Sequence, residues 1–148
     1  LYTYWKRTGP APVMMTLDAS KRDVCRVRRE RTSTPLETFV LMNGPQFVEA
    51  ARVLSETILK QHADDEGAAV TELFRTLTGR PPDEDELTIL TELHTQQLDY
   101  FVSNSGKAAE YLKTGQRAAD EKLDANRLAA LSTVANALFS FDEVVNRR

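Results

Sequence analysis

The chain has 148 residues, a formal net charge of −3, 41% hydrophobic residues and 28% charged residues. These values are ordinary for one globular domain and exclude a chain that stays unfolded for lack of apolar side chains. The single cysteine, Cys25, excludes an internal disulfide. No apolar run approaches the roughly 20 residues of a membrane-spanning helix, so the sequence predicts no membrane span.

Charge is distributed unevenly along the chain. Residues 1–32 carry eight basic and three acidic side chains and a net charge of +5, whereas the remainder carries 11 basic and 19 acidic side chains and a net charge of −8. We expect the basic segment to associate with the acidic remainder. The chain begins inside an aromatic run, Leu1–Trp5, rather than at an initiator Met. We therefore expect it to be a fragment of a larger protein, with any targeting signal upstream.

The first 33 residues show little helical periodicity. Gly9-Pro10-Ala11-Pro12 interrupts any helix, because proline lacks a backbone donor and clashes with the preceding turn. We expect a short strand near residues 13–17 and one helical turn over residues 19–24, with Asp18 placed to cap it. The sequence thus predicts an irregular basic segment over residues 1–33.

Helix signals begin at residue 34. Thr34, Pro35 and Glu37 form a capping box with proline at the first helical position, and Asn43-Gly44 predicts the end of that helix. Pro45 suits the start of a second helix, whose apolar residues form one stripe to about Gln61.

Three further helices are predicted in the rest of the chain, with a fourth, shorter one between them. One follows Asp64 and ends at Gly79, and the next is capped by Asp83 with Glu86. A loop at residues 103–106, a short helix over 107–113 and an irregular stretch over 115–123 follow. The last helix runs from about Asp124 to Val145 and has a wide apolar face, which favours a central position.

Together these elements predict an all-α fold: one irregular bundle of about five to six helices after a largely non-helical N-terminal segment. We expect residues 1–148 to form a single domain, with residues 34–148 as its helical body.

The sequence contains no phosphate-binding glycine loop, no zinc-protease motif and no nucleophile elbow, so it identifies no catalytic residue and no metal or cofactor site. Carboxylates at 64–66 and 83–86 are predicted to cap helices, because a helix N-terminus favours negative charge. We expect His94 to be a hydrogen-bonded residue at the edge of the core. We expect Cys25 to be buried as a small apolar residue, with a thiolate activated by nearby arginines as the alternative.

Five arginines make the N-terminal segment unusual. They are Arg22, Arg26, Arg28, Arg29 and Arg31. The favoured interpretation pairs them with body acids such as Glu37, Glu49 or Asp142, or with upstream domains of the same chain. The alternative is an anion-binding site for a sulfated or carboxylated sugar, because the planar guanidinium suits such groups. Nucleic-acid binding is disfavoured by the negative net charge and the lack of a matching fold signature.

Aromatic residues begin the same segment and are followed by Lys6 and Arg7. Aromatic rings beside cations are typical of sugar contacts and of cation stacking. On the glycan interpretation we expect Tyr4 and Trp5 to contact the ligand. The other interpretation is that they anchor the segment onto the helices.

Several motifs along the chain carry a family resemblance. They are Leu1–Thr8, Asp18-Ala19, Val24-Cys25, Arg28–Thr32, Thr34–Leu36, Leu41–Asn43, Pro45–Arg52, Thr78–Pro82, Val134–Leu138 and Phe141–Glu143. With these motifs the chain resembles the C-terminal domain of unknown function in the large planctomycete proteins that carry an N-terminal cytochrome-c-like domain. The chain departs from that pattern at Gly44, where aspartate is expected, and at Ser140-Phe141, where Asn-Leu is commoner.

The resemblance implies a large, multidomain protein that is exported or periplasmic. It implies a haem c in the upstream domain and none in this part of the chain. The family has no established activity, so the resemblance assigns no catalytic residue in this chain. The leading hypothesis is therefore an uncharacterised structural or interaction domain of an exported, cytochrome-c-associated protein, and the alternative is a site that acts on or binds anionic polysaccharide.

Overall fold

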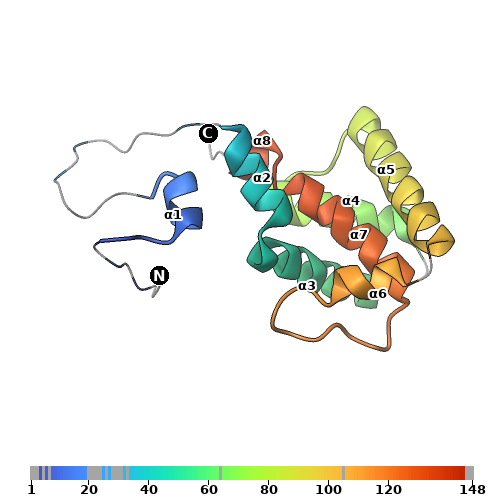
Figure 1. The fold of residues 1–148 in the computed structure, drawn as a ribbon. Helices are drawn as coiled ribbons and strands as arrows, with labels where there is room; N and C mark the ends of the chain where they lie inside the picture. The colour runs from blue at the N-terminus through green and yellow to red at the C-terminus, as the bar shows by residue number, and fades with distance from the viewer. Residues whose placement is uncertain are drawn as a thin grey trace. The chain divides into compact units, whose positions relative to one another are not determined.

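The structure is a computed structural model that describes residues 4, 6, 8–19, 25, 27, 32, 34–63, 65–104 and 106–145. Figure 1 shows the helices of these residues, which are α1 (Pro12–Thr16), α2 (Pro35–Asn43), α3 (Pro45–Gln61), α4 (Glu66–Thr78), α5 (Glu84–Ser103), α6 (Lys107–Leu112), α7 (Ala125–Leu138) and α8 (Asp142–Val145). No strand occurs among the described residues. The predicted all-α fold is confirmed, and no helix of this part is long and apolar enough to cross a membrane.

The chain divides into two compact units, unit 1 (Leu1–Val40) and unit 2 (Leu41–Arg148), with the boundary inside α2. In unit 1 the predicted strand near residues 13–17 is wrong. Pro12 instead occupies the first turn of the short helix α1, where its fixed φ suits a helix and its missing donor costs nothing. Most of the predicted turn over residues 19–24 lies outside the described residues. Whether the whole chain forms one domain stays a prediction.

The capping signals at the start of α2 are confirmed. The backbone N–H of Thr34 donates to Glu37 Oε2 at 2.9 Å, and the N–H of Glu37 donates to Thr34 Oγ1 at 3.3 Å. These reciprocal bonds satisfy donors that the first turn of a helix leaves without partners. Asp18 Oδ2 accepts hydrogen bonds from the backbone N–H and the hydroxyl of Thr32. Residues 20–24, which Asp18 is predicted to cap, lie outside the described residues, so that cap stays a prediction.

Helix α7 is central in unit 2, as its wide apolar face predicted. It packs against α3, α4, α5 and α6, and it lies between α3 and α5 in Figure 1. Its buried residues include Leu128, Leu131 and Val134, each at most 1% exposed. Burying a side chain of this size contributes about 1.5–3 kcal/mol, so this one helix anchors the core.

The predicted last helix is interrupted. Helix α7 ends at Leu138, and α8 begins at Asp142. Between them the N–H groups of Ser140 and Phe141 bond to carbonyls three residues earlier, which tightens the turn. The turn brings the ring centre of Phe141 to 6.2 Å from the ring centre of Phe74 on α4. The helix therefore ends where this aromatic packing begins.

Candidate functional site

The predicted anion-binding arginines, together with Trp5, lie outside the described residues. Tyr4 is described, and 83% of its surface is exposed. The anion site therefore stays a prediction. Cys25 is exposed, so its predicted burial is wrong.

A charged face of α3 is the most elaborate polar structure in unit 2. It consists of Glu49, Arg52, Glu56 and Lys60, whose spacings of three and four residues place them on one side of the helix. Arg52 and Glu56 are 1% and 2% exposed. Charged residues are almost never this buried unless they are paired, so this face has a definite structural partner.

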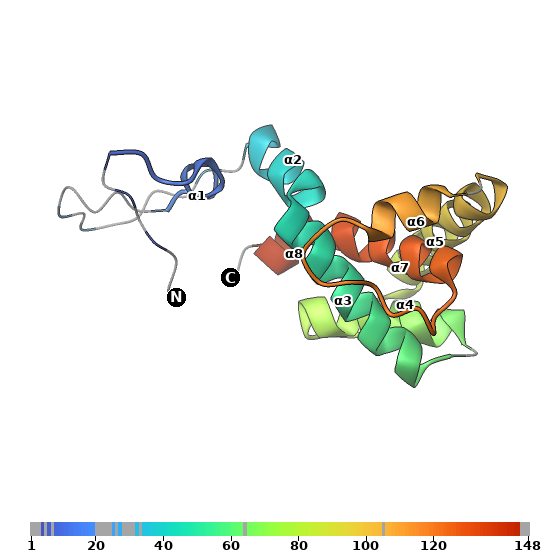
Figure 2. The ribbon, with the colours of Figure 1, turned by 60° about the horizontal axis from the view of Figure 1, so that its bottom comes forward.

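That partner is the segment between α6 and α7, residues 113–124, called the α6–α7 loop below. Figure 2 shows this loop running beside α3. Arg52 Nη1 donates to Glu56 Oε1 at 2.7 Å, and Arg52 Nη2 donates to the backbone carbonyl of Arg117. Glu56 Oε1 also accepts from the backbone N–H of Asp120 at 3.3 Å. The buried ion pair thus supplies both a donor and an acceptor to the loop backbone.

The two outer residues of the charged face hold the same middle part of the loop, residues 116–120. Glu49 accepts hydrogen bonds from the backbone N–H groups of Gln116 at 3.0 Å and Arg117 at 2.8 Å, and these bonds hold the pKa of Glu49 below its ordinary value. Lys60 Nζ lies 2.6 Å from Asp120 Oδ2, and this contact lowers the pKa of Asp120. Four side chains of one helix therefore hold an irregular loop in place.

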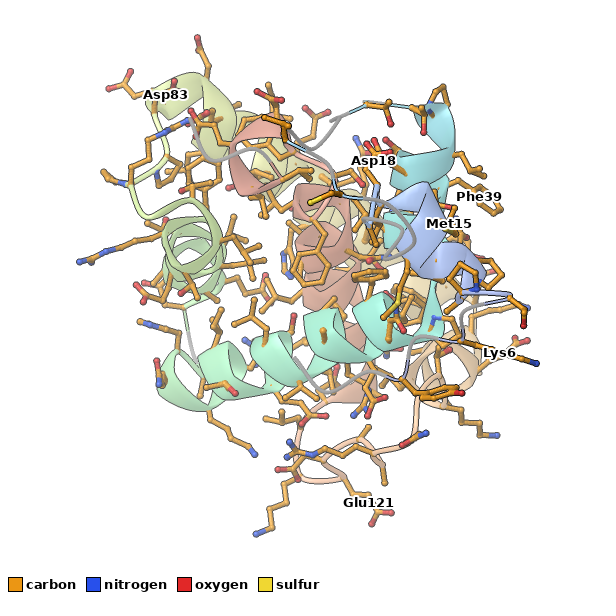
Figure 3. The ribbon with its side chains drawn as sticks, turned by 90° about the vertical axis from the view of Figure 1, so that its left-hand side faces the viewer. Lys6, Met15, Asp18, Phe39, Asp83 and Glu121 are labelled. Carbon is orange, nitrogen blue, oxygen red and sulfur yellow. The ribbon has the colours of Figure 1, made fainter. Side chains whose placement is uncertain are left out.

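The loop encloses one side of a cavity of about 580 Å³. Its walls come from α6, from the start of α7 and from the loop itself, and are mostly apolar. The apolar lining residues are Ala109, Leu112, Ala118, Ala119, Leu123, Ala125 and Leu128. Charged residues also line it, and Glu121 projects from the tip of the loop in Figure 3. Such an apolar hollow with a few polar groups suits binding of a small ligand or an apolar segment.

A second ionic group joins α4, α5 and α7 around His94. Arg127 Nε lies 3.2 Å from Glu66 Oε1, and Arg127 Nη2 donates to the carbonyl of Ala63 at 2.7 Å. His94 is 3% exposed, and its Nδ1 lies 3.8 Å from Glu66 Oε2. Burial lowers the pKa of His94, the nearby Glu66 carboxylate opposes that shift, and Arg127 adds to it. His94 is therefore more deeply buried than predicted, with an acidic neighbour beyond hydrogen-bond distance.

The predicted helix caps in unit 2 are confirmed. Asp65 Oδ1 accepts from the N–H of Ala68 at 2.8 Å. Asp83 and Glu86 form a full capping box at the start of α5, with distances of 2.8 and 2.9 Å. These carboxylates act as helix N-terminal acceptors, as their sequence positions indicated.

Comparison with known families decides the affiliation of the chain. The model of the family PSD1, described as a protein of unknown function (DUF1553), matches residues 1–94. The chain belongs to this family. No curated protein and no solved structure matched the chain. The DUF1553 match includes the charged face of α3, whereas the α6–α7 loop that this face holds lies beyond residue 94.

Proposed function

We propose that this DUF1553 chain is a structural and interaction domain of a larger exported protein that also carries a cytochrome-c-like domain. The sequence resemblance described above supports the cytochrome association and the export. One structural observation supports the role as a structural and interaction domain: the buried Arg52–Glu56 pair fixes the α6–α7 loop through hydrogen bonds to the loop backbone. Side chains that hold a loop in this way build a surface of fixed shape, which is what an interaction domain needs.

The test uses the complete natural protein with its upstream sequence. Haem absorbance is expected in the purified protein, and thermal unfolding is then followed at the haem band. Arg52→Ala, which destabilises unit 2, is expected to lower the temperature at which the haem domain unfolds, because the two domains contact each other. Glu92→Ala, on an exposed position of α5, is the matched control. A protein without haem would refute the cytochrome association, and a haem domain insensitive to Arg52→Ala would refute the interaction.

The alternative function is binding of an anionic polysaccharide by the arginine-rich segment. The observation that favours it is the exposure of Tyr4, of whose surface 83% is accessible to solvent. Titration of the full chain with heparin, compared with a variant in which Arg22, Arg26, Arg28, Arg29 and Arg31 are all glutamine, tests it. Saturable binding that the variant loses, and that Tyr4→Ala weakens, supports this function. Equal binding by both proteins refutes it.

A further inference from the structure

A second hollow lies where α4, α5 and the α7–α8 turn meet, and is called the α5–α8 pocket below. Its volume is about 340 Å³, and it is lined by Phe74, Glu86, Ile89, Leu90, Ala137, Leu138, Ser140 and Phe141. It is distinct from the cavity under the α6–α7 loop. Asp83, at the start of α5, and Glu121, at the tip of that loop, lie at opposite edges of unit 2 in Figure 3.

The α5–α8 pocket has an apolar floor and an exposed apolar lip. Phe74 and Leu138 are 1% and 5% exposed, whereas Ile89 and Phe141 are 64% and 37% exposed. Ile89 therefore presents to solvent an apolar side chain that continues the surface of the floor. Exposed apolar groups around a hollow are typical of a place where another apolar group binds.

One polar atom in the wall is left without a partner. Ser140 Oγ is buried and makes no hydrogen bond to any described residue. A buried hydroxyl is normally hydrogen-bonded, so an unsatisfied one in a pocket wall is a place where an incoming carbonyl or amide can bond. This feature favours a polypeptide over a purely hydrocarbon ligand.

Acidic residues adjoin the pocket and form what is called its acidic rim below. Glu86 lines the pocket, Asp83, Glu84 and Asp85 directly precede it at the start of α5, and Glu143 of α8 is joined to it through Arg80. Arg80 bonds to Glu86 and Glu143, and together with Asp83, Glu84 and Asp85 these six residues have a formal charge of −4. Arg147 and Arg148, which follow α8, lie outside the described residues.

Arg80 already has its partners. Its Nη1 and Nη2 bond to Glu86 at 2.7 and 2.6 Å, its Nε bonds to Glu143 at 3.0 Å, and its guanidinium lies 4.9 Å from the ring centre of Phe74. It thereby fixes one carboxylate of each helix beside the pocket. Glu84 and Asp85, which are exposed on the first turn of α5, leave the rim with negative charge facing solvent.

We propose that the α5–α8 pocket binds a segment of a partner polypeptide that presents one bulky apolar side chain flanked by lysines or arginines. The apolar side chain fills the pocket over Phe74 and Leu138, and the flanking cations pair with the acidic rim. Apolar anchors in pockets carry most binding energy at such interfaces, while charges at the rim steer and orient the partner. The inference rests on the interaction role proposed above and names its surface and the chemistry of its partner.

The test measures binding of a fluorescent synthetic peptide of lysine and serine with one central leucine to the full chain, by fluorescence anisotropy. We expect saturable binding that weakens as salt rises, because the rim contributes by charge. A peptide with serine in place of the leucine is expected to bind at least about tenfold more weakly. A peptide with glutamate in place of lysine is expected not to bind.

Variants of the protein locate the site. Ile89→Asp replaces an exposed side chain, so the fold is retained, and it is expected to weaken binding at least about tenfold. Glu84→Gln with Asp85→Asn is expected to weaken binding and to reduce its salt dependence. Glu121→Gln, at the opposite edge of unit 2, is the matched control and is expected to leave affinity unchanged.

Three outcomes would overturn the proposal. They are no binding of the leucine peptide, equal binding by the wild type and Ile89→Asp, and binding that appears only when Arg147 and Arg148 are replaced by glutamine. The last outcome would mean that the end of this chain occupies the pocket. None of them changes the haem measurements described under the proposed function, so the two proposals fail separately.

Discussion

A Cβ atom on Gly115 would stand 2.6 Å from Oε2 of Glu49. Gly115 has a φ of +107°, a backbone conformation that residues with a side chain rarely adopt. Both facts have one cause: the α6–α7 loop passes directly over the carboxylate that accepts its two N–H groups. A glycine is needed there for the backbone to come this close.

Gly115→Ala is therefore expected to destabilise the protein. The new methyl group clashes with Glu49 and the backbone is strained, so we expect the free energy of unfolding to fall by about 1–3 kcal/mol. Urea unfolding followed by circular dichroism measures this change. Gly67→Ala is the matched control, because Gly67 lies in the first turn of α4 and a Cβ there meets nothing closer than 3.5 Å. We expect that variant to be neutral or more stable by up to about 1 kcal/mol. Similar losses at both positions would contradict the explanation.

Breaking the buried pair of α3 is expected to have a larger effect. Arg52→Met leaves the Glu56 carboxylate buried without its main cation, and Glu56→Gln does the reverse. Each single change is expected to lower the free energy of unfolding by about 3–5 kcal/mol. The double variant Arg52→Met with Glu56→Leu is expected to lose less than the sum of the two, because no unpaired charge remains. Strictly additive losses in urea unfolding would show that the two side chains act independently.

The sequence predicted most of the helices because their signals are local. Thr34 with Glu37, and Asp83 with Glu86, each lie three residues apart, so one short motif specifies the cap. The apolar pattern of residues 128–138 likewise predicted the central helix, because the periodicity of a buried face is visible within one segment. The break after Leu138 was missed because no glycine or proline marks it: it depends on packing of Phe141 against Phe74.

The charged face of α3 was missed for a different reason. Arg52 and Glu56 are hydrogen-bonded to residues more than 60 positions away, and a charged residue in a helix is ordinarily assigned to the solvent side. The available signal was the row Glu49, Arg52, Glu56 and Lys60 on one face, together with Gly115 in a polar stretch. The charged row on α3 does not reveal the loop as its partner, and the loop sequence does not reveal the charged row. The loop takes its shape from hydrogen bonds between its backbone and these side chains, so its own sequence shows no pattern.

The stability of the protein in acid is expected to depend on Glu86. Hydrogen bonds from Arg80, and then from the N–H of Asp83, lower the pKa of Glu86 from 4.5 to about 2. A carboxyl with a lowered pKa in the folded state contributes stability that is complete above its unfolded pKa and is lost as pH falls toward the folded value. Glu86→Gln should therefore reduce the dependence of the melting temperature on pH between about 4.5 and 2. Glu92→Gln, which removes a charge from an exposed position of the same helix, is the control. An unchanged pH profile in Glu86→Gln would refute this account.

His94 is expected to govern stability nearer neutral pH. Burial lowers its pKa in the folded state, with Glu66 opposing and Arg127 reinforcing the shift. Below the unfolded pKa of about 6.5 the unfolded chain binds a proton that the folded chain does not, so stability is complete above that pH and falls as pH decreases toward the folded pKa. His94→Gln keeps a polar side chain of similar size but cannot titrate. Its melting temperature should change less than that of the wild type between about pH 7 and 5. His62→Gln, at the C-terminal end of α3, controls for loss of a histidine. If the melting temperatures of the wild type and His94→Gln fell in parallel on acidification, protonation of His94 would not be the cause of the loss of stability.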